Sequence, residues 1–173
     1  MGAFDNDLRE MYSDIYKKQD QDKKTINNYE LGYLTACIDD AIFSLNYHTK
    51  KNRFTLDPVV IFEFRDERSS LRLSNILKNN GIKHSVKIGY SAYNSKDVRI
   101  VVNSIPNIFS MFNFIGNQIF SERHLILREY INQRIDKLKE NGKARYDDTD
   151  LYYFNKLDNK SKKRECKITT KKL

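Results

Sequence analysis

The chain has 173 residues, the size of about one domain, and its 39% hydrophobic content argues against general disorder. It carries 31 Lys and Arg against 23 Asp and Glu, and this net charge of +8 favours a polyanionic partner such as nucleic acid. No apolar run approaches the ~20 residues of a membrane span, the N-terminus lacks a signal-peptide core, and two cysteines are too few for a disulfide scaffold, so we expect no membrane association and an intracellular, reducing compartment such as a host cytoplasm or an organelle matrix.

The first 26 residues are predicted to form a helical extension, because apolar residues between Phe4 and Tyr16 recur at spacings of three and four. After it, Asn27 and Glu30 resemble a capping box, and the run 31–43 has the length and apolar content of a buried helix. We call this predicted element the central helix.

A β-hairpin is expected next, because the period of the pattern changes to two. Apolar and polar residues alternate from Phe43 to His48, which is typical of a strand with one buried and one wet face. The return strand is predicted over 54–65 after a polar turn at 49–52, and Pro58 suggests an edge position or a bulge.

A second helix and a second hairpin follow. Asp66 can cap the helix at its start, and Gly81 lies where a left-handed residue is wanted at its end. Alternation then returns over 85–90 and 98–103, on either side of a turn-like segment. The sequence therefore predicts two successive units, each a helix followed by a hairpin.

Two further helices are predicted in the last third of the chain. Ser104 with Pro106 marks the start of one, and the other runs from about 121 to 141. The core domain is thus expected over 27–141, and the remaining residues, 142–173, are expected to be a basic C-terminal extension without firm order.

This order predicts an α+β fold in which one four-stranded antiparallel sheet carries its helices on a single face. The open face is expected to be polar and to suit the major groove of a DNA duplex, unless it is an ordinary solvated surface. The residues predicted to contact DNA are Ser44, Asn46, His48, Lys50, Arg53, Glu63, Arg65, Arg68, Ser85, Lys87, Arg99 and Asn103.

The central helix combines small residues with an acidic end. Gly32 and Ala36 lie four apart on one side and permit close approach by a second helix. Asp39 and Asp40 stand at its C-terminal end, where the helix dipole disfavours anions unless a cation offsets them. A divalent ion would resolve the conflict, and the alternative is that the pair only terminates the helix in solvent.

The segment Leu34 to Ala41 resembles the signature of the LAGLIDADG homing endonucleases, and Leu31-Gly32-Tyr33 before it is also usual there. The resemblance covers 27–141 and includes the order of helices and hairpins. It implies an αββαββα fold with a saddle-shaped sheet.

Two registers of this signature are open. Without a gap, Ala41 falls where the family has its metal-binding carboxylate, whereas a one-residue shortening after Asp39 places Asp40 there. We favour the shortened register because it starts the following strand with its polar residues outward. Asp39 would then supply a backbone carbonyl or an outer contact, and it is the ligand if the shortened register is wrong.

The resemblance implies a site-specific DNA endonuclease that works as a homodimer, because this chain holds one copy of the signature. Such a dimer would bind a long, partly palindromic double-stranded site and hydrolyse phosphodiester bonds with Mg²⁺ or Mn²⁺. The implied dimer interface is Gly32, Tyr33, Ala36 and Cys37, the implied metal ligands are Asp40 and Asp39, and the implied catalytic residues are Asp40, Arg65 and Arg123, with Arg68 as an alternative to Arg65.

Two other functions stay open. The altered signature also fits a catalytically inactive DNA-binding protein or an RNA-splicing maturase, for which intron RNA would be a partner. An unrelated basic α+β interaction module, charged only for solubility, is the second alternative; it would be a monomer with ordinary affinity for polyanions.

Overall fold

The computed structural model describes residues 26–50, 53–90, 96–142 and 145–169, of which 50, 96 and 159–169 are described by their backbone only. The predicted helical extension over 1–26 lies outside these residues except for its last position. Within the described residues, no helix is both long and apolar enough to cross a bilayer. The elements in chain order are α2 (Asn28–Asp39), β1 (Ile42–Lys50), β2 (Arg53–Phe64), α3 (Glu67–Asn79), β3 (Ser85–Tyr90), β4 (Lys96–Asn103), α4 (Ile105–Phe114), α5 (Glu122–Asn141) and α6 (Asp148–Thr169).

The helix ends follow the local chemistry of the sequence. The side chain of Asn27 accepts a hydrogen bond of 2.8 Å from the backbone N–H of Glu30, which starts α2. Asp66 does the same for α3 by accepting from the N–H of Ser69 at 2.7 Å. Gly81 has φ 72° directly after the C-cap of α3, a conformation that glycine adopts without strain. These three predicted helix limits are confirmed.

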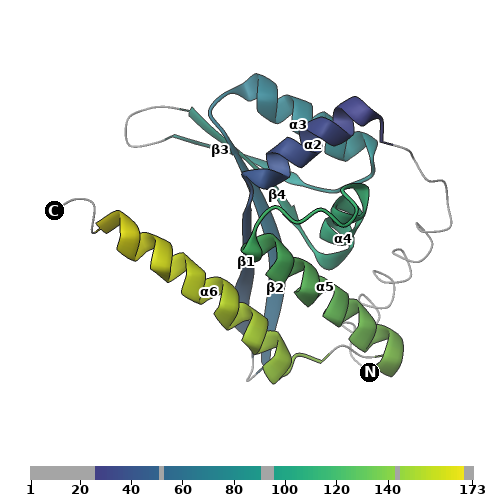
Figure 1. The fold of residues 1–173 in the computed structure, drawn as a ribbon, viewed down its shortest axis with the longest axis vertical. Coiled ribbons are helices and arrows are strands. Elements are labelled where there is room, and N and C mark those ends of the chain that lie inside the picture. Colours follow the sequence, from purple (N-terminus) through teal and green to yellow (C-terminus); the bar gives the residue numbers. More distant parts are fainter. Residues whose placement is uncertain (1–25, 51–52, 91–95, 143–144, 170–173) are drawn as a thin grey trace.

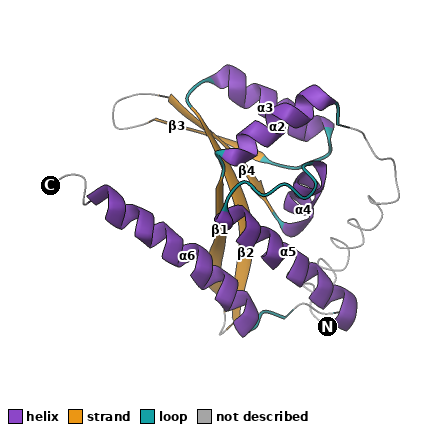
Figure 2. Ribbon diagram, in the orientation of Figure 1, coloured by secondary structure: helices purple, strands orange, loops and turns teal. Residues whose placement is uncertain are grey.

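The four strands form one antiparallel sheet in the order β1-β2-β4-β3. Both predicted hairpins are present, and the helices α2 to α5 lie together beside the sheet (Figure 1; Figure 2). The β1-β2 hairpin is longer than the β3-β4 hairpin. Residues 53–58 of β2 pair only with β1, so Pro58 has no β4 partner and occupies a local edge, as its chemistry requires.

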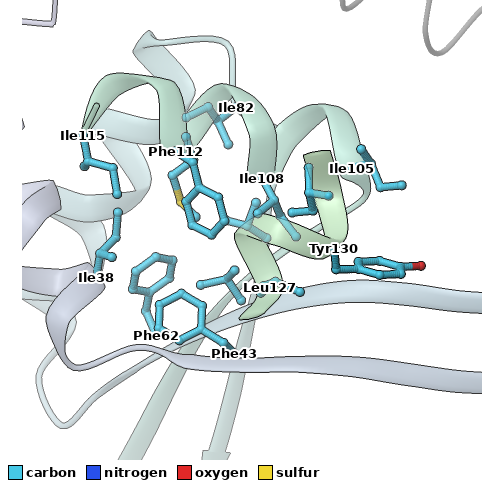
Figure 3. Packing of buried hydrophobic residues seen from close by; sticks show 14 of the residues in the cluster. Ile38, Phe43, Phe62, Ile82, Ile105, Ile108, Phe112, Ile115, Leu127 and Tyr130 are labelled. Atoms are coloured by element: carbon cyan, nitrogen blue, oxygen red, sulfur yellow. The ribbon is translucent and has the colours of Figure 1, made fainter. Parts of the chain in front are cut away.

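The core lies between the sheet and these helices. Phe43 of β1 and Phe62 of β2 point toward Phe112 and Ile108 of α4, and Leu127 of α5 closes the cluster (Figure 3). All five side chains are buried. Because these apolar residues alternate along the strands, the opposite side of the sheet carries mostly polar residues.

The extended part of the β1-β2 hairpin is covered by α6, a helix that the sequence analysis does not predict. Phe154 of α6 packs on the ring of Tyr47 in β1, with centroids 5.4 Å apart, and Tyr146 packs on Phe54 of β2 at 5.8 Å. In Figure 1, α6 runs alongside the lower ends of β1 and β2. A two-stranded hairpin is marginal in water, so this support is needed.

A charged cluster fastens α6 to α5. Arg134 and Asp150 are buried, with Nη1 and Oδ2 3.5 Å apart, and Lys137 Nζ lies 3.3 Å from the same oxygen and 2.6 Å from Asp147. Burial acts to raise the pKa of Asp147, but the hydrogen bond and charge of Lys137 outweigh it and lower this pKa to about 2. A buried carboxylate such as that of Asp150 requires cationic partners. The contacts of Asp147 and Asp150 with Arg134 and Lys137 fix the start of α6.

His124 is held neutral in the core. It is fully buried among aromatic rings, with the centroid of Phe112 4.6 Å away and that of Phe43 5.3 Å away. Its Nδ1 accepts a 3.3 Å hydrogen bond from the N–H of Phe120. Burial, followed by the positive charge of Arg128, lowers the pKa of His124 to about 4.

The free energy of unfolding is therefore expected to decrease between pH 6.5 and pH 4. The unfolded chain takes up a proton on His124 near pH 6.5 and the folded chain only near pH 4, so this stabilisation is complete above 6.5 and is lost toward 4, by at most about 3 kcal/mol. Urea titrations across this range measure the effect. His124→Phe should flatten this part of the profile, and an unchanged slope in that variant would contradict the assignment.

Candidate nucleic-acid interface and metal site

We call the side of the sheet that points away from the core the outward face. Strand register aligns its side chains in rows that cross the sheet, and each row lies two residues along the strand from the next. From the end near α2 to the far end of the hairpin, the rows are Glu63-Arg99-Lys87, Ile42-Ile61-Val101-Ser85, Ser44-Val59-Asn103, Asn46-Asp57 and His48-Thr55.

Most of the residues predicted to contact DNA share this face. They are Ser44, Asn46, His48, Glu63, Ser85, Lys87, Arg99 and Asn103, and all are exposed or half-exposed. Arg53 lies at the hairpin end of β2 opposite Lys50, whose side chain is outside the described set. Arg65 is exposed directly after β2, whereas Arg68 belongs to the first turn of α3 and not to the sheet.

The outward face also carries carboxylates and apolar residues that the sequence analysis passes over. Asp57, Val59, Ile61 and Val101 occupy the same rows as predicted residues, and Asp97 lies on this face opposite Gly89. The period-two alternation of each strand would have found them if it had been extended to every residue of that parity.

Carboxylates on this face lie close to basic side chains, both across neighbouring strands and within β4. Arg99 Nε lies 2.9 Å from Glu63 Oε1, and Arg99 Nη2 lies 3.9 Å from Asp97. Farther along the hairpin, His48 Nε2 lies 3.4 Å from Asp57 Oδ2. The described cations of the strands, Arg53, Lys87 and Arg99, are matched in number by the carboxylates Asp57, Glu63 and Asp97. The positive charge of the chain is therefore not concentrated on the described part of this face.

One side of α2 is exposed along its length. Tyr29, Gly32, Ala36 and Asp39 recur at spacings of three and four and face solvent; we call them the α2 stripe. A Cβ added at Gly32 would meet nothing within 4 Å. The stripe thus places two small residues, Gly32 and Ala36, between Tyr29 and the acidic end of the helix.

Tyr33 and Cys37, which were also predicted at a dimer interface, face α3 more closely. The Tyr33 hydroxyl donates a 3.0 Å hydrogen bond to the carbonyl of Ser69, and the Arg72 guanidinium lies 4.2 Å from the Tyr33 ring centroid. Burial raises the pKa of the Cys37 thiol to about 11, so the thiol is protonated at neutral pH. The contacts of Tyr33 thus hold α2 against α3 of the same chain.

Asp39 and Asp40 stand at the C-terminal end of α2 with exposed side chains. Asp39 is the last helical residue, and the N–H of Asp40 bonds back to the carbonyl of Ile38. The last turn contains no basic residue. The described residues contain no group of three or more His, Cys, Asp and Glu side chains arranged to hold a metal ion. Within one described chain, this acidic end can therefore offer a cation two carboxylates.

The acidic end lies beside a particular row of the outward face. Ile42, the first residue of β1, pairs with Ile61, so the chain segment just before it, Asp40 and Ala41, approaches the level of Glu63. Glu63 pairs with Arg99. The register thus brings the carboxylates of α2 to the same end of the sheet as the Glu63-Arg99-Lys87 row.

Arg123, a predicted catalytic residue, binds backbone carbonyls. Its Nε and Nη2 donate to the carbonyl of Phe43 at 3.1 and 2.7 Å, and its Nη1 donates to the carbonyl of Leu157 at 2.9 Å. These bonds join α5 to β1 and α6. Residue spacing does not predict these hydrogen bonds, because Phe43 and Leu157 are both far from Arg123 in the sequence.

No family model matches the sequence, and no curated protein matches it significantly. Solved structures do match the fold. The homing endonuclease I-TnaI superposes with a TM-score of 0.52 and 8% identity over 73% of this chain and 84% of that one. The LAGLIDADG homing endonuclease I-GzeII, in complex with its DNA target, gives a TM-score of 0.50 and 17% identity over 76% of this chain and 43% of that one. The chain thus spans less than half of I-GzeII.

These similarities confirm the predicted α+β fold and its resemblance to homing endonucleases. At this level of identity they concern the fold alone, so the activity has to be argued from the residues of the chain.

Proposed function

We propose that this chain, which has the fold of the LAGLIDADG homing endonucleases, is a DNA endonuclease that binds a long double-stranded site as a homodimer. The observation that carries the proposal is the arrangement of α2, where the small exposed residues Gly32 and Ala36 lead to two exposed carboxylates at the same end of the sheet as the Glu63-Arg99-Lys87 row. The α2 stripe, the proposed docking surface, thus ends at the acidic end of α2, and the outward face, the proposed DNA-binding surface, begins at the same end of the sheet.

The outward face fits a DNA major groove in its spacing. Neighbouring rows are about 6.7 Å apart along a strand, and two base-pair steps of a duplex rise by about the same distance. Ser44, Asn46 and Asn103 supply hydrogen-bonding groups to base edges, whereas Lys87 and Arg53 supply positive charge for phosphates. Ile61 and Val101, which are paired and half-buried, form an apolar patch that suits thymine methyl groups.

Asp40, with Asp39 beside it, is proposed to hold Mg²⁺ or Mn²⁺. Carboxylate oxygens suit these hard cations, which keep several waters and complete their coordination with substrate phosphates, so two carboxylates per chain fit. When bound, the ion would supply Lewis-acid stabilisation of the phosphate and a more acidic water. The chain itself places the carboxylates at the end of a rigid helix and leaves them open to a duplex.

A second copy of the chain is proposed to pack on the α2 stripe. Gly32 and Ala36 allow two helices to approach closely, and a two-fold axis through this contact brings both acidic ends together. Two strands of one duplex would then each meet one acidic end. Arg65, which follows β2 at this end of the sheet, is the basic residue that we propose to order the attacking water, with Arg68 as the alternative. Arg123 receives no such role because its nitrogens serve backbone carbonyls.

The first test is binding and cutting of duplex DNA with and without Mg²⁺. The chain is expected to bind duplexes with a strong salt dependence, and Lys87→Ala should reduce the slope of log K against log salt by about one. Asn132→Ala on the exposed side of α5 is the matched control and should leave the slope unchanged. Equal slopes in all three proteins would remove Lys87 from the phosphate contacts.

A non-cleaving DNA-binding protein, or a maturase with intron RNA as its partner, is the second candidate. It is favoured by the alternative register, in which Ala41 takes the place of the metal-binding carboxylate. Tight sequence-selective binding without any cut product in Mg²⁺ or Mn²⁺ would support it. Preference for a structured intron RNA over duplex DNA would support the maturase.

A further inference from the structure

The carboxylates of the outward face are at odds with simple DNA binding. Most of the affinity of a protein for DNA comes from neutralising phosphates, so each carboxylate that faces a duplex reduces it. Asp57, Glu63 and Asp97 nevertheless lie on this face, and the Glu63 side chain is 43% exposed. Their presence requires a benefit other than affinity.

Glu63 is placed to hold Arg99 in one orientation. In the Glu63-Arg99-Lys87 row, Arg99 has a carboxylate opposite it on β2 and an ammonium opposite it on β3. Like charges repel and opposite charges attract across strands, so both neighbours direct the guanidinium toward Glu63. The 2.9 Å contact uses Arg99 Nε, and Asp97 lies 3.9 Å from Nη2. The terminal nitrogens of Arg99 keep N–H groups for another acceptor.

We propose that Glu63 is a specificity-determining residue, which fixes the Arg99 fork for the O6 and N7 atoms of a guanine and opposes other bases at that position. This inference rests on the proposed function. A bidentate contact needs the planar group in one orientation, and an oriented arginine loses less side-chain entropy on binding. A carboxylate beside it accepts from the amino group of cytosine and repels the acceptor atoms of other bases. Glu63 thus lowers the affinity for all duplexes and raises the discrimination between bases at one position.

The test uses a pool of randomised duplexes of about 30 base pairs, which is longer than the ~20 base pairs that the described sheets of a dimer would span. The duplex that wild type selects is compared with one in which each G·C pair in turn is replaced by A·T. Wild type should discriminate by about tenfold or more at one position in each half-site. Glu63→Gln should bind unselected duplexes more tightly than wild type and should discriminate at that position by less than about threefold.

Asp57→Asn is the matched control, because it removes the same charge from the same face without touching Arg99. It should also bind unselected duplexes more tightly but should keep the discrimination. Arg99→Lys keeps the charge without the fork and should lose the discrimination as Glu63→Gln does. Thermal melting confirms that each exposed-site variant is folded.

Three results would overturn the proposal. If wild type selects no sequence, the inference and the proposed function both fail. If wild type selects a sequence and Glu63→Gln discriminates as well as wild type does, only the inference fails. If Asp57→Asn loses the same discrimination, net charge is the cause and Glu63 has no particular role.

Discussion

Asp40→Asn is expected to lower the rate of DNA cleavage by at least about a thousandfold while the affinity for the selected duplex changes by less than about tenfold. The amide keeps the size of the side chain but loses the charge that holds a divalent cation. The exposed position at the end of α2 means that the substitution removes no partner within the described part of the chain. Single-turnover cleavage of the selected duplex in Mg²⁺, with binding measured in Ca²⁺, separates the two effects.

Asp39→Asn is the matched variant, one residue earlier on the same helix. Under the favoured register it should reduce cleavage far less than Asp40→Asn does. If the two losses are reversed, Asp39 is the ligand and the shortened register is wrong. If neither variant changes the cleavage rate, the acidic end of α2 takes no part in the reaction.

The second large effect is expected for Ala36→Leu, which should prevent dimer formation and raise the dimer dissociation constant by at least about a thousandfold. The new side chain would occupy the surface where a second α2 must approach closely. Ala36 is exposed within its own chain, so the monomer can accept a leucine there. Sedimentation velocity at several concentrations measures the change, and cleavage should be lost together with the dimer.

Two controls make this result specific. Gly32→Ala meets open space in the single chain and should stabilise an isolated helix by about 0.5–1 kcal/mol, so a loss of dimer affinity there can come only from a partner. Asn132→Leu places the same side chain as Ala36→Leu on the exposed side of α5 and should leave the dimer intact. A dimer that survives both stripe variants would place the interface elsewhere.

Local chemistry made the fold predictable. Capping side chains such as Asn27 and Asp66 act within four residues, and alternation in β1 and β4 reports directly which side of a strand is buried. The two hairpins, the single open face and the acidic end of α2 therefore follow from short stretches of sequence. Most of the predicted DNA contacts share one face for the same reason.

The missing parts depend on contacts between distant residues. The sequence of α6 is rich in charge, and its few apolar positions, Phe154 and Leu157 among them, are explained only by the hairpin and α5 that they cover. The partners of Arg123 are backbone carbonyls more than 30 residues away. The pairing of Glu63 with Arg99 requires the β2-β4 register, which no local pattern supplies.

The outer half of the β1-β2 hairpin is structurally separate from the rest of the sheet. It is paired to nothing but itself and is supported from one side by α6, so its outward residues Asn46, His48 and Thr55 can be exchanged without rebuilding the acidic end of α2. Under the proposed function, a library of substitutions at these three positions should therefore change the preferred outer base pairs of the DNA site without changing the rate of cleavage.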